Sequence, residues 1–378
     1  MPNSVDIKKQ IIKYIIYLVV VLGLTALALY FSIGSNFNKI IETIKQAHVG
    51  YLFLIVGIVL LCILCRFVVI FVLTRIFEKK YLFHRAIVID QVGTLYRMIT
   101  PAGLGGHVME GYVYSKQGVK LSSALSVIAM YSIVYQVVLI LYGIITIAVK
   151  HDLVNQIGYI PISFTSTSPV NVPLWVLISI GFAFNVLSIG FILLISYWNG
   201  FFKFIRGPIV SLLAKLHIVK NKEVTQSGLD ETVKNFRENL KRLFTHWPSL
   251  LISVVMFFLY ITISYSTPYF SGLSLGNTSG YANFWDSVLL SNFHQMVTCI
   301  IPIPGSSVIS EMFFLQLFYP SSGPSFYSTE EIARASLLLW RSLMFIIPLF
   351  ISLVVTLIYR PRKKKNINEN NENQNPQE

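Results

Sequence analysis

TPAGLGG, at positions 100–106, interrupts an apolar segment that runs from about 87 to 113, and Glu110 follows the interruption. A second segment, about 285–318, is interrupted by IPIPGSS at positions 301–307, and Glu311 follows that interruption. Irregular backbone at membrane depth needs protein or a polar cavity to satisfy its N–H and C=O groups. The pattern therefore predicts two half-crossing helical hairpins that face a shared interior, like the discontinuous helices of transport sites.

The composition is that of an integral membrane protein. Apolar residues make up 54% of the chain and charged residues 12%, against about 25% charged in an average soluble domain. Six stretches are long and apolar enough to cross a bilayer as helices: 11–33, 51–73, 121–149, 174–198, 250–270 and 337–359. We expect an all-α membrane protein with about six full spans plus two opposed re-entrant hairpins.

The basic residues gather on one side of the predicted spans. A formal charge of +13 suggests a nucleic-acid partner in a soluble protein. With the amino terminus inside, however, 23 of the 30 lysines and arginines are cytoplasmic, as the positive-inside rule expects. The charge thus predicts a multi-pass protein of the cell (plasma) membrane with both termini cytoplasmic, and no nucleic acid. Arg85 and Lys116 flank the first hairpin, which then enters from the cytoplasmic face, and the second enters from the outer face.

The chain divides into a polytopic membrane domain over 1–359 and a tail over 360–378. The tail is basic and then rich in Asn and Glu, and we expect it to be disordered. The loop 199–248 carries apolar residues at helical spacing, with Ser227 as the expected N-cap. This cytoplasmic amphipathic loop fits an interfacial helix on the inner leaflet or an elbow between two spans. The loop 150–173 is rich in Ser, Thr and Pro and is expected to be an exposed connection.

Enzyme and metal motifs are absent from the sequence. It contains no GxSxG elbow, Walker loop, HExxH or metal-spaced His/Cys cluster. We therefore predict no catalytic residue, cofactor or metal. Cys62 and Cys65 form a CxxC inside a predicted span, where small buried hydrophobes are the simpler interpretation.

Several charged side chains fall within predicted membrane segments, where each costs about 2.5–3.5 kcal/mol. Asp90 and Arg97 lie two turns apart on one helix face, and Glu110 follows the glycine turn. Two alternatives are open for this set. Its charges neutralise one another and have no further role, or the set also binds a charged lipid head group. The turn supports the second alternative, because N–H groups at Gly105 and Gly106 could hold a phosphate.

The second hairpin repeats this chemistry with Pro304, Gly305 and Glu311. Arg341, near the start of the last span, could pair with Glu311 or hold a phosphate. Secondary candidates for head-group contact are Arg66, Asp90, Asp286 and His294. Of these, Arg66 could face the interior or snorkel toward the cytoplasm, and a lone His is more often a packed hydrogen-bonding residue than a ligand.

Three regions resemble the membrane part of the lysylphosphatidylglycerol synthases, the multiple peptide resistance factors, and their shorter flippase-like relatives. They are LYRMITPAGLGGHVMEGYVYSKQGV (95–119), IPIPGSSVISEMFFLQLF (301–318) and ARASLLLWRSLMFIIPLF (333–350). The resemblance covers about 9–359. By family pattern it points to Pro101, Gly105, Gly106, Pro304, Gly305, Glu311 and Arg341 as site residues, to which the local chemistry adds Arg97 and Glu110.

The resemblance implies a role in lipid metabolism and antibiotic resistance. In full-length relatives a cytosolic domain transfers lysine from lysyl-tRNA to phosphatidylglycerol, and the product is moved to the outer leaflet, where it repels cationic peptides. We expect the transferase domain to be absent here. The leading hypothesis is therefore a flippase that moves a modified phospholipid between leaflets. Alternatives are a phosphatidylglycerol lysyltransferase, which would need lysyl-tRNA, or an accessory subunit of a separate lipid-modifying enzyme, and the chain could form a homo-oligomer.

Overall fold

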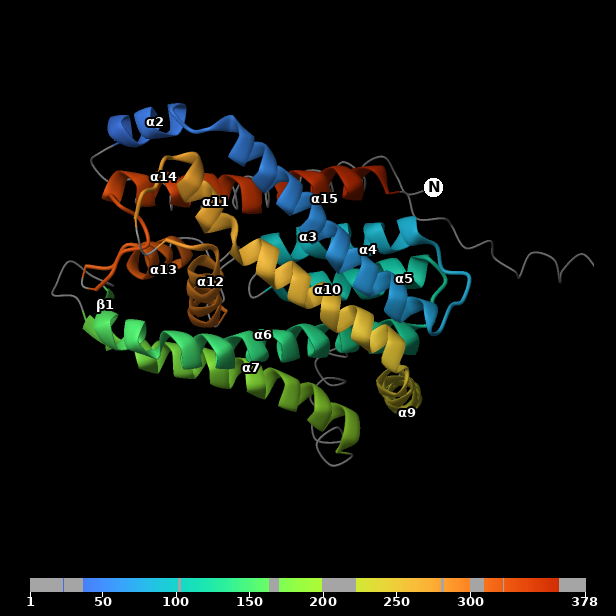
Figure 1. Cartoon of the computed structure of the whole chain (residues 1–378). Coiled ribbons are helices and arrows are strands. Elements are labelled where there is room, and N and C mark those ends of the chain that lie inside the picture. The colour runs from blue at the N-terminus through green and yellow to red at the C-terminus, as the bar shows by residue number, and fades with distance from the viewer. Residues whose placement is uncertain are drawn as a thin grey trace, which may run out of the picture.

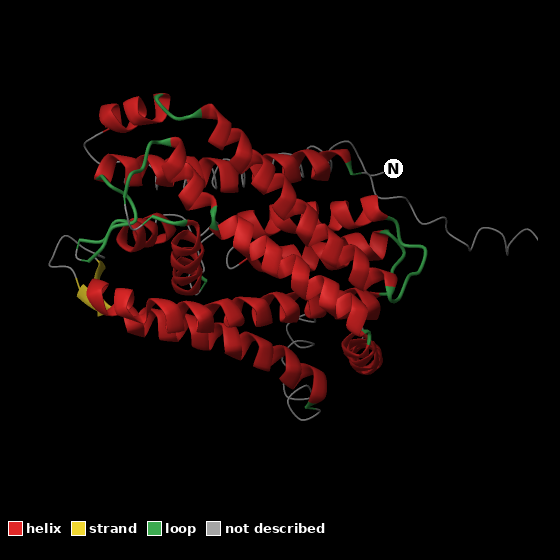
Figure 2. Ribbon diagram, in the orientation of Figure 1, coloured by secondary structure: helices red, strands yellow, loops and turns green. Residues whose placement is uncertain are grey.

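The computed structural model describes residues 23, 37–100, 103–162, 170–198, 222–279, 282–299, 309–321 and 323–359. Within these residues the chain is a bundle of helices with one short two-stranded hairpin (Figure 2). The strands are β1 (Tyr159–Ile162) and β2 (Val170–Pro173), paired antiparallel. The all-α membrane architecture predicted from composition is confirmed at this level.

Five helices in the described part of the chain are long and apolar enough to cross a membrane. They are α3 (Val49–Arg75), α6 (Leu121–Ile157), α7 (Leu174–Tyr197), α10 (Trp247–Tyr265) with α11 (Thr267–Ser274), and α14 (Glu330–Arg341) continuing into α15 (Ile347–Ile358). They correspond to five of the six predicted spans. The sixth, 11–33, lies outside the described residues except at Gly23. A short helix, α2 (Phe37–Lys45), packs on α14 through Ile40 and Ala335.

The last span contains a π-helical segment, η4 (Ser342–Ile346), between α14 and α15. Pro348 follows it at the start of α15. Proline lacks the N–H that would bond to the carbonyl four residues earlier, and π segments are one way a helix absorbs such a fault. Arg341 is the last residue of α14 and directly precedes this π-helical segment.

Both interrupted segments form pairs of helices, and the pairs lie at opposite ends of the bundle (Figure 1). The first pair is α4 (Phe83–Ile99) and α5 (Leu104–Lys116), and the second is α12 (Phe284–Thr298) and α13 (Ile309–Phe318). Gly103 precedes α5 with a φ of 67°, a left-handed conformation that glycine adopts without strain. Pro101 and the break 301–307, with Pro304 and Gly305, lie outside the described residues.

Glycines let these broken helices approach their neighbours closely. A Cβ at Gly106 of α5 would lie 2.9 Å from the Gly93 carbonyl oxygen of α4. A Cβ at Gly181 of α7 would lie 2.6 Å from the carbonyl carbon of Met296 in α12. Small residues at such crossings are typical of membrane helices, where backbone contact replaces hydrophobic driving force.

Three local predictions were wrong. Helix α6 continues past 149 to Ile157, with a kink at Lys150 (φ −115°, ψ 19°). The loop that follows contains the β1–β2 hairpin, because its β-branched residues can pair despite the Ser/Thr/Pro-rich composition. Helix α9 (Lys222–Thr245) begins before Ser227, which is therefore not its N-cap.

Helix α9 packs against the protein along part of its apolar face. Leu240 and Leu243 are fully buried in the core shared with α3, α4, α6 and α10. The Ser126 hydroxyl of α6 donates to the Ser122 carbonyl of its own helix at 2.7 Å and lies 3.4 Å from the Phe236 carbonyl oxygen of α9. These contacts join α9 to the same end of the bundle as α4 and α5 (Figure 1).

Candidate functional site: a charged network between α3, α4 and α5

The site begins with a forked ion pair between two helices. Arg66 of α3 donates to Asp90 of α4 through Nε to Oδ1 at 2.9 Å and through Nη2 to Oδ2 at 3.1 Å. Gln91 adds a 2.8 Å hydrogen bond from Nε2 to Asp90 Oδ2. The Asp90 side chain is fully buried and that of Arg66 is 14% exposed. Two donors on one carboxylate fix the geometry of both groups.

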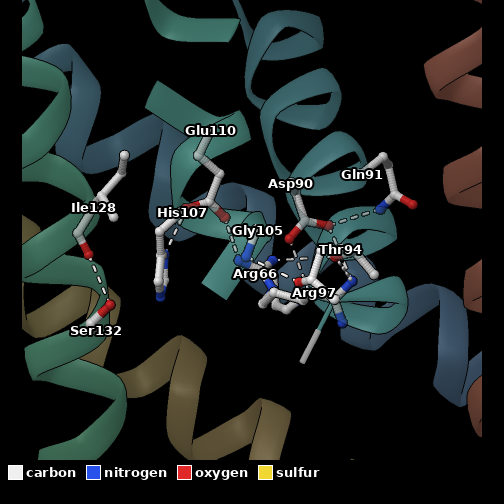
Figure 3. A network of polar contacts seen from close by, with 11 residues as sticks. Arg66, Asp90, Gln91, Thr94, Arg97, Gly105, His107, Glu110, Ile128 and Ser132 are labelled. Carbon is white, nitrogen blue, oxygen red and sulfur yellow. Dashed lines mark hydrogen bonds and ion pairs between the residues drawn. The ribbon is translucent and has the colours of Figure 1, made fainter. Parts of the chain in front are cut away.

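A second ion pair joins the two arms of the first hairpin. Arg97 of α4 pairs with Glu110 of α5, and His107 Nδ1 lies 3.0 Å from the other Glu110 oxygen. Thr94 Oγ1 accepts from Nη2 of Arg97 at 3.3 Å and from Nη2 of Arg66 at 3.5 Å. The two pairs are therefore linked into one network from Asp90 to His107 (Figure 3).

The network is electrically balanced but open on one side. Two guanidinium groups face two carboxylates, so the set can lie inside a membrane bundle without net charge. The side chains of Arg97 and His107 are 26% and 45% exposed, whereas that of Glu110 is 5% exposed. The exposed members of the network are therefore Arg97 and His107, which shield the buried Glu110 carboxylate that they contact.

Tyrosines from α6 and α10 adjoin the arginines. The Arg66 guanidinium lies 5.8 Å from the centroid of the Tyr260 ring, within cation–π range. Tyr131 of α6 lies close enough to interact electrostatically with Arg66, Arg97 and Asp90. The network thus borders the interface with the long spans as well as the hairpin itself.

The sequence predicted the members of this network better than their pairing. Asp90, Arg97 and Glu110 were expected to form one set, but Asp90 is paired with Arg66 instead. Of the two alternatives for Arg66, the interior one is confirmed. The pairing of Arg66 with Asp90 could have been predicted from the positions of the two residues. Helices α3 and α4 are joined by a short turn, and Arg66 and Asp90 lie at similar distances from that turn along their helices.

The glycines of the first break serve the turn and the helix contact. The Gly105 N–H donates to Thr100 Oγ1 at 3.0 Å, so it is already used within the turn. Gly106 lies against Gly93 and the Arg97 side chain. The predicted binding of phosphate by the N–H groups of Gly105 and Gly106 stays a prediction, and the Gly105 N–H would have to leave Thr100 to take part in it.

In the second hairpin Arg341 pairs with Glu311, one of the two alternatives predicted for it. Arg341 Nε lies 2.8 Å from Glu311 Oε1, and the side chains are 7% and 0% exposed. The Arg341 guanidinium also lies 4.5 Å from the Phe345 ring centroid. This pair is distinct from the network around Arg97.

The remaining candidates lie apart from both arginine pairs or have structural partners. His294 Nε2 lies 2.8 Å from the Ser310 carbonyl, and its ring packs edge-on against Trp340. It is a packed hydrogen-bonding residue, the more common reading of a lone histidine. Asp286 lies in the first turn of α12 and pairs with Lys150 of α6.

No group of three or more His, Cys, Asp and Glu side chains that could hold a metal ion occurs in the described part of the chain. Cys62 and Cys65 are buried in α3, within its apolar packing.

The sequence matches one known protein family. The family model described as lysylphosphatidylglycerol synthase TM region matches residues 14–352. A search of the curated proteins gives no match.

Proposed function

Because the chain belongs to the lysylphosphatidylglycerol synthase transmembrane-region family, we propose that it moves a phospholipid between the two leaflets of the plasma membrane. The family and the apolar helices make it a multi-pass membrane protein concerned with lipid modification or translocation. The proposal that it moves the lipid rests on the charge-balanced, partly exposed network inside the helical bundle, which consists of Arg66, Asp90, Arg97, Glu110 and His107.

The chemistry of this network suits a phospholipid head group. Guanidinium groups bind phosphate through parallel N–H donors and are less strongly hydrated than ammonium groups. Arg97 would take the phosphate at its exposed edge, and Glu110 would take an amine if the lipid carries one. The acyl chains would stay in the bilayer while the head group crosses, so the hydrophobic tails need not be exposed to water.

Basic residues in the loops near this site indicate on which side of the membrane it lies. Lys79, Lys80, Arg85, Lys116 and Lys120 lie around the turns that precede α4 and follow α5. By the positive-inside rule this end of the bundle would be cytoplasmic. The site would therefore receive a lipid from the inner leaflet, and the opposite end, with the β1–β2 hairpin, would face outward.

The test is lipid movement in vesicles that contain purified protein and tail-labelled fluorescent phosphatidylglycerol. We expect Arg97→Gln to slow movement at least ten-fold, because the phosphate loses its guanidinium. The matched control is Arg334→Gln, which removes an arginine whose pair with Glu330 lies at the surface. Equal rates for wild type and Arg97→Gln, with folded protein in both, would contradict the role of the network.

A second candidate is suggested by the family description itself, which names a synthase. Incubation of the purified protein with lysyl-tRNA and phosphatidylglycerol, followed by mass spectrometry of the lipids, tests this activity. We expect no lysylated lipid, and its formation would assign a transferase activity in addition to movement.

A further inference from the structure

The Glu110 carboxylate is shared by two basic side chains. One of its oxygens pairs with Arg97 of α4, and the other lies 3.0 Å from Nδ1 of His107, one turn away on α5. The Glu110 side chain is 5% exposed, whereas those of Arg97 and His107 are 26% and 45% exposed. The two basic groups are thus the members of this cluster that an incoming ligand can touch.

The contact with Glu110 decides which nitrogen of His107 carries a proton. An ionised carboxylate only accepts hydrogen bonds, so Nδ1 must be the donor. The other ring nitrogen, Nε2, points away from Glu110 (Figure 3). It is a bare acceptor in neutral His107 and an N–H donor in protonated His107. A phosphate bound beside Arg97 would therefore be repelled by the neutral ring and would gain a second donor from the protonated ring.

The net charge of the network depends on the state of His107. Arg66 and Arg97 balance Asp90 and Glu110, so the network is neutral while His107 is neutral. A phosphodiester head group such as that of phosphatidylglycerol carries one negative charge, and its entry would leave one net negative charge. An unbalanced charge inside a membrane bundle is costly. One proton on His107 removes the imbalance.

The other titratable groups at the network are two carboxylates, two arginines and three tyrosines. The tyrosines are Tyr114, Tyr131 and Tyr260, from α5, α6 and α10. Arginine keeps its proton in proteins, and tyrosine is neutral near pH 7. Histidine is the side chain that ordinarily changes its charge between about pH 5 and 8. His107 is therefore the first candidate for a proton taken up at neutral pH, and Glu110 is the alternative that an experiment has to separate from it.

We propose that the network binds a proton on His107 together with an anionic phosphodiester head group, so that the proton is a co-ligand of the lipid. Thermodynamic reciprocity requires that the proton strengthens lipid binding by the same factor as the lipid strengthens proton binding. Lipid binding is therefore tight at acidic pH, where His107 is protonated, and weakens as the pH rises and the proton is lost. This inference rests on the proposed function for the identity of the ligand, but binding can be measured without movement.

The first test counts the protons that are bound with the lipid. Dihexanoyl phosphatidylglycerol is titrated calorimetrically into the purified protein in detergent, in two buffers that differ in ionisation enthalpy, and the difference in heat gives the protons taken up per lipid. We expect uptake by wild type that is largest between about pH 5 and 8. His107→Gln should take up none, because glutamine keeps an N–H donor for Glu110 but cannot become charged.

The matched control for this experiment is His151→Gln. His151 also has a ring nitrogen 3.0 Å from a carboxylate oxygen, that of Asp152, but it lies in the C-terminal part of α6, away from the network. Its replacement removes a histidine with the same kind of partner. Proton uptake on lipid binding should therefore be the same in His151→Gln as in wild type.

The second test follows the affinity for the same lipid as the pH changes. For wild type the affinity should fall at least about ten-fold between about pH 5.5 and about pH 8.5, as histidine loses its proton. For His107→Gln the change should be less than about two-fold. His107→Arg, whose guanidinium keeps its charge at both pH values, should bind tightly throughout, and it also provides a test if His107→Gln does not fold.

The outcomes separate the proton from lipid movement. Uptake that persists in His107→Gln would place the proton on Glu110 and overturn the role of His107. Binding by wild type without proton uptake, or no binding at any of these pH values, would overturn the proposal, and movement in the vesicle assay would still support the proposed function. Uptake that requires His107, in a protein that moves no lipid, would support the proton site and contradict only the proposed function.

Discussion

At the scale of single residues, three arginines inside the bundle are each paired with a carboxylate from a neighbouring helix. Arg66 is paired with Asp90, Arg97 with Glu110, and Arg341 with Glu311. Pairing removes the net charge from each site, but it does not recover the full cost of desolvating both ions. Such pairs are therefore weak evidence for stability, and a function that uses their charges is a reason to keep them.

The Arg66–Asp90 pair predicts a strong asymmetry between single and double variants. Asp90→Asn should lower the stability by about 3–5 kcal/mol, because it leaves a largely buried guanidinium without its counter-charge. The double variant Arg66→Met, Asp90→Leu should recover most of this loss. Thermal unfolding in detergent measures both.

Glu330→Gln is the control for this experiment, because Glu330 is 48% exposed and paired with Arg334 at the surface. Its loss should cost at most about 1 kcal/mol. If Asp90→Asn unfolds at the same temperature as wild type, the pair does not have the energetic role argued for it.

The charged residues of the site could be predicted from the sequence, but their ion-pair partners could not. Charges in apolar segments correctly indicated a polar interior, because hydrocarbon does not tolerate them singly. The partner of Asp90 did not follow from helix periodicity, because that argument compares positions on one helix and Arg66 is on another. The Lys150–Asp286 pair does not follow from the sequence either, because the composition of 150–173 predicts a loop, whereas α6 continues through Lys150 to Ile157.

At the scale of elements, the Pro-Gly breaks divide the two interrupted segments into short helices that pack closely. The helix ends at 99 and 104 agree with the sequence, because the left-handed Gly103 and the preceding proline cannot continue a helix. The β1–β2 hairpin could not be predicted from composition, because Ser, Thr and Pro also occur in irregular loops. The approach of α12 to α7 depends on Gly181, whose role is visible only once Met296 lies against it.

The contact between α4 and α5 predicts that glycines in the same helix differ in their tolerance of a methyl group. Gly106→Ala should destabilise the protein by about 1–3 kcal/mol, because the new Cβ meets the Gly93 carbonyl oxygen and must push the helices apart. It should also slow lipid movement by displacing Arg97 from Glu110.

Gly111→Ala is the matched control, because a Cβ there meets nothing within 4 Å. In a helix interior this change should stabilise by up to about 1 kcal/mol. Unfolding temperatures of the two variants give the comparison, and equal effects would show that α4 and α5 are not in backbone contact.

At the scale of the whole molecule, the two broken helix pairs occupy opposite ends of one bundle (Figure 1). Each end has its own buried core. One core is formed around α3, α4, α6 and α10. The other is formed around α12, α13, the C-terminal end of α6 and the N-terminal end of α7. The charged network lies at the first end, and the Lys150–Asp286 pair lies at the second.

The orientation of the bundle can be tested by cysteine labelling in intact cells. Ser321→Cys should react with an impermeant maleimide, because the exposed loop after α13 is predicted to face outward. Lys79→Cys, equally exposed in the turn after α3, should react only after the membrane is permeabilised. The reverse pattern would place the Arg97 network at the outer leaflet and invert the proposed direction of loading.

Lipid movement is measured by the fraction of tail-labelled phosphatidylglycerol that dithionite can bleach from outside vesicles holding the purified protein. Dithionite does not cross the bilayer, so without movement only the outer leaflet, about half of the label, is lost. We expect bleaching to approach completion for wild type and to return toward one half for Arg97→Gln. Bleaching that stays at one half with folded wild-type protein, in vesicles of phosphatidylglycerol and of phosphatidylethanolamine alike, would show that the protein does not move these lipids.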